Sequence, residues 1–161
     1  MKTVTSFLDI RFLFLWVLVL LLVGCTQDRG VQPVIPIIIA KGDLIGNGTD
    51  KIGEKSFVIS STEEWNQLLS NIDSANRRRM VVLEDRVDFD KYTVLAIFDT
   101  VWMSNAGSSI SVSIVENSKN VYVETVYDSA DTRTLMAIQY RPYLIVKIPQ
   151  TTKSVQFNTQ K

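Results

Sequence analysis

Two residue types that carry much of enzyme chemistry are scarce in this sequence. Its 161 residues include no His, and the only Cys is Cys25. The absence of His excludes Ser-His-Asp and Cys-His catalysis and removes the commonest zinc ligand. A single Cys excludes an internal disulfide and a cysteine-bound iron–sulfur cluster. The chemistry that stays open relies on carboxylates, Lys, Tyr, Ser–Lys pairs, or oxygen ligands for a cation such as calcium.

Two groups of side chains have types suited to that chemistry. Asp88 and Asp90 precede an apolar run, and paired carboxylates can share a proton or hold calcium. Asp43, Asn47 and Asp50 lie in a glycine-containing segment, but their spacing is not that of an EF-hand loop. The alternative at both places is an ordinary turn, which is the interpretation we favour. We therefore expect no catalytic residue, no metal site and no cofactor.

The N-terminus gives Cys25 a context of its own. Lys2 and Arg11 precede an uninterrupted apolar run, Phe12–Val23, and Gly24 stands directly before Cys25. A basic head, a short apolar stretch and a small residue are typical of a secretory signal. The run is shorter than the roughly 20 apolar residues that a membrane-spanning helix needs.

The sequence Leu-Val-Gly-Cys at the end of this run resembles the lipobox of bacterial lipoproteins. The resemblance implies that residues 1–24 are a removable signal peptide and that Cys25 carries lipid, palmitate included. Because each buried methylene contributes about 0.8 kcal/mol, several acyl chains hold a protein lastingly at a membrane. We therefore expect a membrane-anchored protein of the bacterial cell envelope. Thr26 and Gln27 follow Cys25, with no Asp at the second position to indicate retention in the inner membrane, so in a diderm cell we favour the outer membrane.

Composition predicts one ordinary domain behind that anchor. The 17 Lys and Arg balance 17 Asp and Glu, which argues against a nucleic-acid partner because such binders carry a basic excess. Residues 25–36 contain Gly30, Pro33 and Pro36 and read as a short tether. Residues 37–161 are enough for a single domain with its own core.

The hydrophobic pattern predicts several strands and one clear helix. The helix runs from Ser61 to Ile72, with a capping-box spacing at its start and one apolar face. Residues 93–98 are almost all apolar, as in a central strand that is covered on both faces. Residues 109–115 alternate between apolar and polar, and a turn joins them to 121–127 in a hairpin. Further strands are expected at 37–40, 57–60, 80–83, 143–148 and 155–157. The predicted fold is α+β and β-rich, a largely antiparallel sheet with the helix packed on it.

Three segments resemble the PrcB C-terminal domain family: Phe57–Trp65, Val87–Asp90 leading into Val94–Ile97, and Pro142–Pro149. The likeness covers about residues 37–158. The family is named after a lipoprotein subunit of a surface protease complex. The resemblance implies a lipid-anchored accessory protein that binds or stabilises another envelope protein, such as a protease, without catalysis of its own.

The family often has a Gly-Gly-Tyr-like turn where this chain has 104–110, and only Gly107 keeps that character. Around it, Trp102, Met103 and Asn105 form the candidate interaction site, since a large aromatic in a loop is either tucked onto the core or available as an anchor. The segment 128–134 is a candidate to flank it.

Other functions stay open at this point. The Arg77–Arg79 run either forms a solvated face or contacts anionic headgroups or an acidic partner. The alternative function is a small-ligand or polysaccharide binder, which requires a concave pocket with a few convergent polar groups. A carboxylate hydrolase would need two acidic side chains facing each other across a cleft.

Overall fold

The computed structural model describes residues 30–45, 52–76, 84, 86–104, 109–128 and 138–160. At positions 45, 73–76, 102–104, 128, 138 and 160 only the backbone is described. The expected signal peptide, Cys25, the strand at 80–83 and the Arg77–Arg79 run all lie outside the described residues. Within the described part of the chain, no helix has the length and apolar character needed to cross a membrane.

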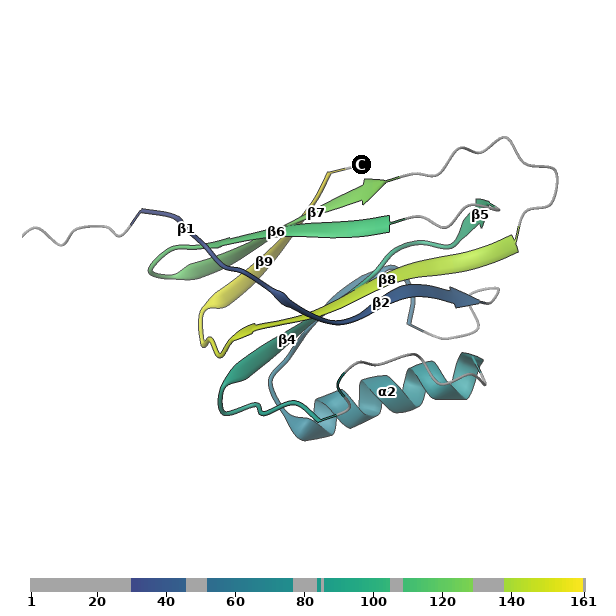
Figure 1. Ribbon diagram of the computed structural model, residues 1–161, viewed down its shortest axis with the longest axis horizontal. Coiled ribbons are helices and arrows are strands. Elements are labelled where there is room, and N and C mark those ends of the chain that lie inside the picture. Colours follow the sequence, from purple (N-terminus) through teal and green to yellow (C-terminus); the bar gives the residue numbers. More distant parts are fainter. Residues whose placement is uncertain are drawn as a thin grey trace, which may run out of the picture.

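The strands form two sheets that pack face to face, with a helix on the outer side of one of them (Figure 1). The first sheet has the order β2-β8-β4-β3, with β5 also paired to β8; the second has the order β1-β6-β7-β9. The bounds in the first sheet are β2 Ile37–Ile45, β3 Lys55–Ile59, β4 Tyr92–Phe98, β5 Trp102–Ser104 and β8 Ile138–Pro149. Those in the second are β1 Gln32–Pro33, β6 Ser109–Glu116, β7 Asn120–Asp128 and β9 Ser154–Gln160.

Strand β4 lies between two separate cores, which explains its continuous apolar sequence. Val94, Ala96 and Phe98 belong to the core beneath the helix, whereas Leu95 and Ile97 belong to the core between the sheets. All five side chains are buried. The prediction of a central strand covered on both faces is therefore confirmed.

The helix, α2 (Thr62–Asn76), begins with the predicted capping box. Ser61 Oγ accepts a hydrogen bond from the backbone N of Glu64 at 3.2 Å, and Glu64 Oε2 accepts one from the backbone N of Ser60 at 2.9 Å. Trp65 and Ile72 are buried on the apolar face that packs on the first sheet. The helix runs four residues past the predicted end at Ile72, to Asn76.

The second sheet explains the alternating segment. Ile110 and Ile114 on β6 are buried between the sheets, while Ser111 and Ser113 are exposed. The predicted hairpin to β7 is confirmed, and Asn117 Oδ1 closes its turn by accepting hydrogen bonds from the backbone N of Lys119 and Asn120.

The structure is β-rich and mostly antiparallel, as predicted, but it differs from a single sheet in two respects. The strands divide between two sheets, because β6 and β7 present an apolar face that only a second apolar face can cover. Strand β9 also runs parallel to β7, its neighbour in the second sheet. In addition, β1 lies inside the segment expected to be a tether, where Gln32 pairs with Glu116.

A tyrosine lies across the first sheet where a glycine leaves room for it. Gly42 on β2 stands opposite Tyr143 on β8, and a Cβ at Gly42 would come within 3.2 Å of the Tyr143 hydroxyl. The Tyr143 ring stacks on Phe98 with 6.1 Å between centroids, and Phe98 meets Phe57 edge-on at 5.9 Å. These aromatic contacts tie three neighbouring strands together beneath the helix.

Candidate functional site at the loop end

Several strands end or begin at one end of the sandwich, which we call the loop end: the ends of β2, β5 and β7 and the starts of β6 and β8 (right-hand side of Figure 1). In the first sheet, Ile45 pairs with Tyr140, and Tyr140 pairs with Trp102. In the second sheet, Ser109 pairs with Asp128. The strand ends at Ile45, Ser104, Ser109, Asp128 and Ile138 therefore lie at this one place.

The predicted interaction residues fall at the loop end in part. Trp102 and Met103 lie in β5, opposite Tyr140 and Gln139, so they belong to a short strand instead of the expected loop. Sequence reasoning missed this strand because three residues are too few to show a pattern of alternation. Asn105 and Gly107 lie outside the described residues, as does most of segment 128–134.

The pairing along β8 is interrupted between β4 and β5. Phe98 pairs with Tyr143 and Trp102 pairs with Tyr140, so three residues on one strand face two on the other. This is the count of a β-bulge, which bends a strand and redirects its side chains. The backbone N of Asp99 still donates to the carbonyl oxygen of Pro142 at 3.0 Å, and Pro142 itself has no N–H to offer β4.

Two charged residues are buried at this bulge. Asp99 is 0 % exposed and Arg141 is 5 % exposed. Nη1 of Arg141 donates a hydrogen bond to the backbone carbonyl oxygen of Asp99 at 2.6 Å, and Asp99 Oδ1 accepts one from the backbone N of Thr100 at 2.7 Å. Buried charges are tolerated only when they are paired and hydrogen-bonded, and both residues make further contacts. The bulge is therefore held by charge-assisted hydrogen bonding.

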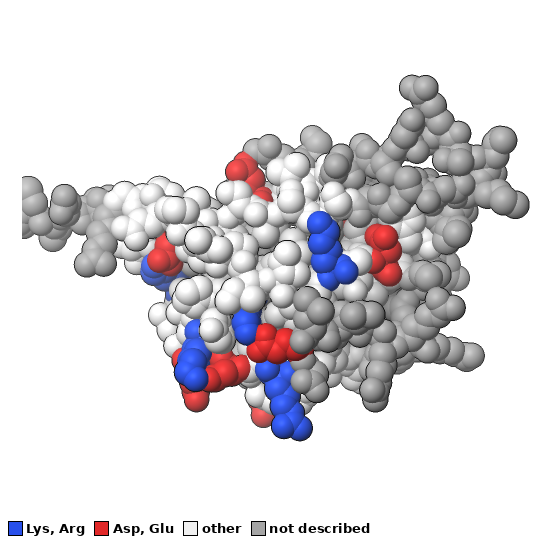
Figure 2. Space-filling model, in the orientation of Figure 1, with Lys and Arg blue, Asp and Glu red and all other residues white. Residues whose placement is uncertain are grey.

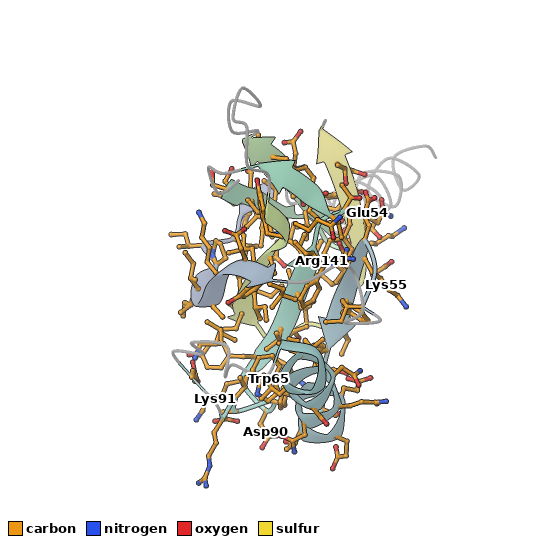
Figure 3. All side chains as sticks on the ribbon, turned by 90° about the vertical axis from the view of Figure 1, so that its right-hand side faces the viewer. Glu54, Lys55, Trp65, Asp90, Lys91 and Arg141 are labelled. Carbon is orange, nitrogen blue, oxygen red and sulfur yellow. The ribbon has the colours of Figure 1, made fainter. Side chains whose placement is uncertain are left out.

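The same region reaches into the second sheet through Tyr127. Burial raises the pKa of Tyr127, and the negative charges of Asp99 and, more weakly, Glu54 raise it further, while a hydrogen bond with the Thr159 side chain opposes the shift. A Tyr in these surroundings stays protonated at neutral pH, so it acts as a hydrogen-bonding group and not as a base. Figure 3 looks onto this end of the molecule and shows where Glu54 and Arg141 lie on it.

The sequence did not single out Asp99, Arg141, Glu54 or Tyr127. One signal was available, since Arg141 stands within an otherwise uncharged apolar stretch, 135–146. A charge at such a position is buried with a partner when the strand is covered on both faces.

The acidic pair forms a turn, as we expected. Asp88 Oδ1 accepts a hydrogen bond from the backbone N of Asp90 at 3.2 Å, and Asp88 Oδ2 pairs with Lys91 Nζ at 2.6 Å. The hydrogen bond from Lys91 is the main reason that the pKa of Asp88 is lowered. Both carboxylates therefore belong to a local solvated turn.

The other predicted group of oxygen ligands is described only at Asp43, because Asn47 and Asp50 lie outside the described residues. Partial burial raises the pKa of Asp43. Burial also raises the pKa of Tyr143, with a smaller contribution from the nearby Asp43 charge. Over the part of the chain that the structure describes, no three His, Cys, Asp or Glu side chains come close enough together to hold a metal ion.

Comparison with known proteins found no match. No protein-family model matches the chain, and no curated protein or solved structure matches it.

A hollow lies away from the loop end, between α2 and β3. This hollow has a volume of about 310 Å³. Its lining mixes apolar, charged and amide side chains: Ile52, Lys55, Phe57, Ile59, Glu64, Gln67, Leu68 and Asn71. Lys55 Nζ already lies over the Phe57 ring, 5.0 Å from its centroid. The hollow is at the lower limit of the volumes that small-molecule sites have.

The surface charges are mixed. On the face shown in Figure 2, acidic and basic side chains alternate among the described residues. Two of the ion pairs are Lys91 with Asp88 and Lys153 with Glu116, the latter at 2.7 Å. Such pairs neutralise each other locally, so they contribute little long-range attraction for a highly charged ligand.

Proposed function

We propose that this chain is a lipid-anchored accessory protein of the bacterial cell envelope that binds or stabilises another envelope protein, without catalysis of its own. Cys25 is the lipid attachment site in this proposal, and residues 1–24 are removed. In a diderm cell the anchor is in the outer membrane. An envelope protease is the partner to test first, because of the resemblance of residues 37–158 to the PrcB C-terminal domain family.

The observation that carries the proposal is the arrangement of the loop end. Five strand ends from both sheets meet there, and the buried hydrogen bond from Arg141 to Asp99 fixes the bulge beneath them. A binding surface gains affinity when its backbone is held in place before the partner arrives. The backbone of Trp102 pairs with Tyr140 at this place, and Trp is frequent among the anchor residues of protein interfaces.

The test is capture of the native, lipidated protein from a chemically crosslinked envelope, followed by mass spectrometry. Trp102→Ala is compared with Val58→Ala, which changes an exposed side chain on β3 at a distance from the loop end. We expect a reproducible partner that is recovered several-fold less with Trp102→Ala and equally well with Val58→Ala. The melting temperatures of both variants are measured, so that lost folding is not mistaken for lost contact. Recovery of the anchored protein alone in every sample would contradict the proposal.

The second candidate function is a small-ligand or polysaccharide binder, and the hollow between α2 and β3 is the observation that favours it. Its Lys55 and Gln67 side chains offer hydrogen bonds to a sugar or another small polar ligand. Screening sugars and small metabolites against Gln67→Ala and wild type by thermal shift distinguishes the two functions. A ligand that stabilises the wild type and not Gln67→Ala would favour this second candidate.

A further inference from the structure

The exposed apolar side chains are concentrated near the N-terminal end of the described chain. Of the large hydrophobic residues that the structure describes as exposed, four lie within eight positions: Val31 at 61 %, Ile35 at 85 %, Ile37 at 49 % and Ile38 at 51 %. Residues 30–40 contain no charged side chain. We call these four residues the apolar strip. Single exposed apolar residues need no explanation, but four exposed aliphatic side chains within one short uncharged segment call for one.

The apolar strip is held in place on the domain. Gln32 and Pro33 pair with β6, and the backbone N of Val34 donates to the carbonyl oxygen of Ile114 at 2.8 Å. Val34 turns inward and packs against the core between the sheets, which leaves Ile35 pointing outward. Ile37 and Ile38 then pair with β8 in the first sheet. The strip is therefore a fixed feature of the domain surface.

Its position relative to the proposed anchor restricts what can cover it. Four residues lie between Cys25 and Gly30, and the five extended Cα–Cα steps that join these two residues span at most about 18 Å. A domain attached through Cys25 must therefore keep the first residues of the strip close to the bilayer surface. Large aliphatic side chains on a segment that carries no charge of its own are suited to the boundary between headgroups and acyl chains.

Strand addition by a partner protein fits the strip less well. Strand β2 is at the edge of the first sheet, but its pairing shifts between Ile38 and Ala40, which is an irregularity that disturbs an added ladder. Exposed Lys41 follows directly, and a Lys on an edge strand also discourages pairing with another chain.

From these observations we infer that Val31, Ile35, Ile37 and Ile38 contact the lipid surface to which Cys25 is attached. This inference rests on the lipid anchor in the proposed function. It also gives the domain an orientation. Gln32 pairs with Glu116 at the last residue of β6, whereas Ser109, the first residue of β6, is at the loop end roughly 23 Å away. Contact through the strip thus leaves the loop end directed away from the anchoring point.

The test uses the full-length lipidated protein in vesicles of phosphatidylethanolamine and phosphatidylglycerol. Because an acylated Cys25 has no free thiol, a new Cys is the only site for a thiol-reactive fluorophore. Ile35→Cys is compared with Val58→Cys and Val126→Cys, which are both exposed apolar positions outside the strip. We expect lipids spin-labelled near the headgroup to quench the probe at position 35 several-fold more than at the other two.

The remaining outcomes are each decisive. Equal and weak quenching at all three positions would overturn the inference. So would a probe at position 35 that is shielded from aqueous iodide but not quenched by the spin-labelled lipids, because protein would then cover the strip. Labelling of the protein without any introduced Cys would show a free Cys25 thiol. That result would refute the lipid anchor itself and is distinguishable from failure of the strip.

Discussion

Arg141 on β8 and Asp99 at the end of β4 are joined by a hydrogen bond of 2.6 Å from Nη1 to a backbone carbonyl oxygen, across 42 positions of sequence. Both residues are buried. The bond holds the bulge where β4 passes into β5, so it supports the strand that carries Trp102. Its role is to position the loop end, because neither residue is exposed enough to meet a partner directly.

Replacing this arginine tests that role. We expect Arg141→Met to lower the free energy of unfolding by about 1.5–3 kcal/mol, the range for a hydrogen bond to a charged group. Arg86→Met is the control, since Arg86 is exposed. The measurement is urea denaturation followed by circular dichroism. Equal stability of the two variants would mean that the bond to Asp99 contributes nothing to the fold.

The second buried cation, Lys147, predicts an asymmetric result. Its Nζ lies 2.5 Å from Glu84 Oε2 and 4.4 Å from the centroid of Tyr92, and the residue is only 8 % exposed. Glu84→Gln leaves a nearly buried ammonium without its carboxylate, so we expect a loss of about 1–3 kcal/mol. Lys147→Met removes the charge and keeps much of the packing, so it should cost less. In the Lys147→Met background, Glu84→Gln should have little further effect, and additive losses in this double-mutant cycle would disprove the pairing.

The start of α2 gives a local prediction. Ser61→Ala removes the oxygen that accepts from the backbone N of Glu64, and loss of such a cap costs about 1 kcal/mol. Ser70→Ala is a matched control, because Ser70 is exposed in the middle of the same helix and Ala is the better helix former there. Thermal melting should therefore shift downward for Ser61→Ala only. A similar shift for both would show that the capping bond is not significant.

Two aspartates should change the pH dependence of stability in opposite directions. Burial raises the pKa of Asp43 above 3.8, so its native state holds the proton more tightly and its contribution to stability falls as pH rises from 3.8 through the raised pKa. Lys91 lowers the pKa of Asp88 below 3.8, so the contribution of Asp88 is present above 3.8 and is lost as pH falls through the lowered pKa.

The test is unfolding at a series of pH values from acid to neutral. Relative to wild type, Asp43→Asn should become more stable as pH rises through its window, and Asp88→Asn should become less stable as pH rises toward 3.8. Each variant serves as the control for the other. Parallel curves for the two variants would contradict both assignments.

The candidate site could be predicted only in part from the sequence. Trp102 stood out because a large aromatic followed a finished apolar strand, and the structure places its backbone at the loop end. Asp99 and Arg141 did not stand out, because the sequence alone does not distinguish a buried charged residue from a solvated one until its partner is known. That partner lies on a strand distant in the sequence.

What the sequence determined by itself was local and periodic. The capping box of Ser61 and Glu64, the apolar face with Trp65, the continuous core strand β4 and the alternation in β6 all follow from spacings of a few residues, which helix and strand geometry impose on any chain. Only the tertiary structure decided that the strands form two sheets, that β9 runs parallel to β7, and that a bulge brings Arg141 to Asp99. The physical reason is that an apolar strand can pair with several neighbours, and its partner and register are fixed only when all the apolar faces are buried together.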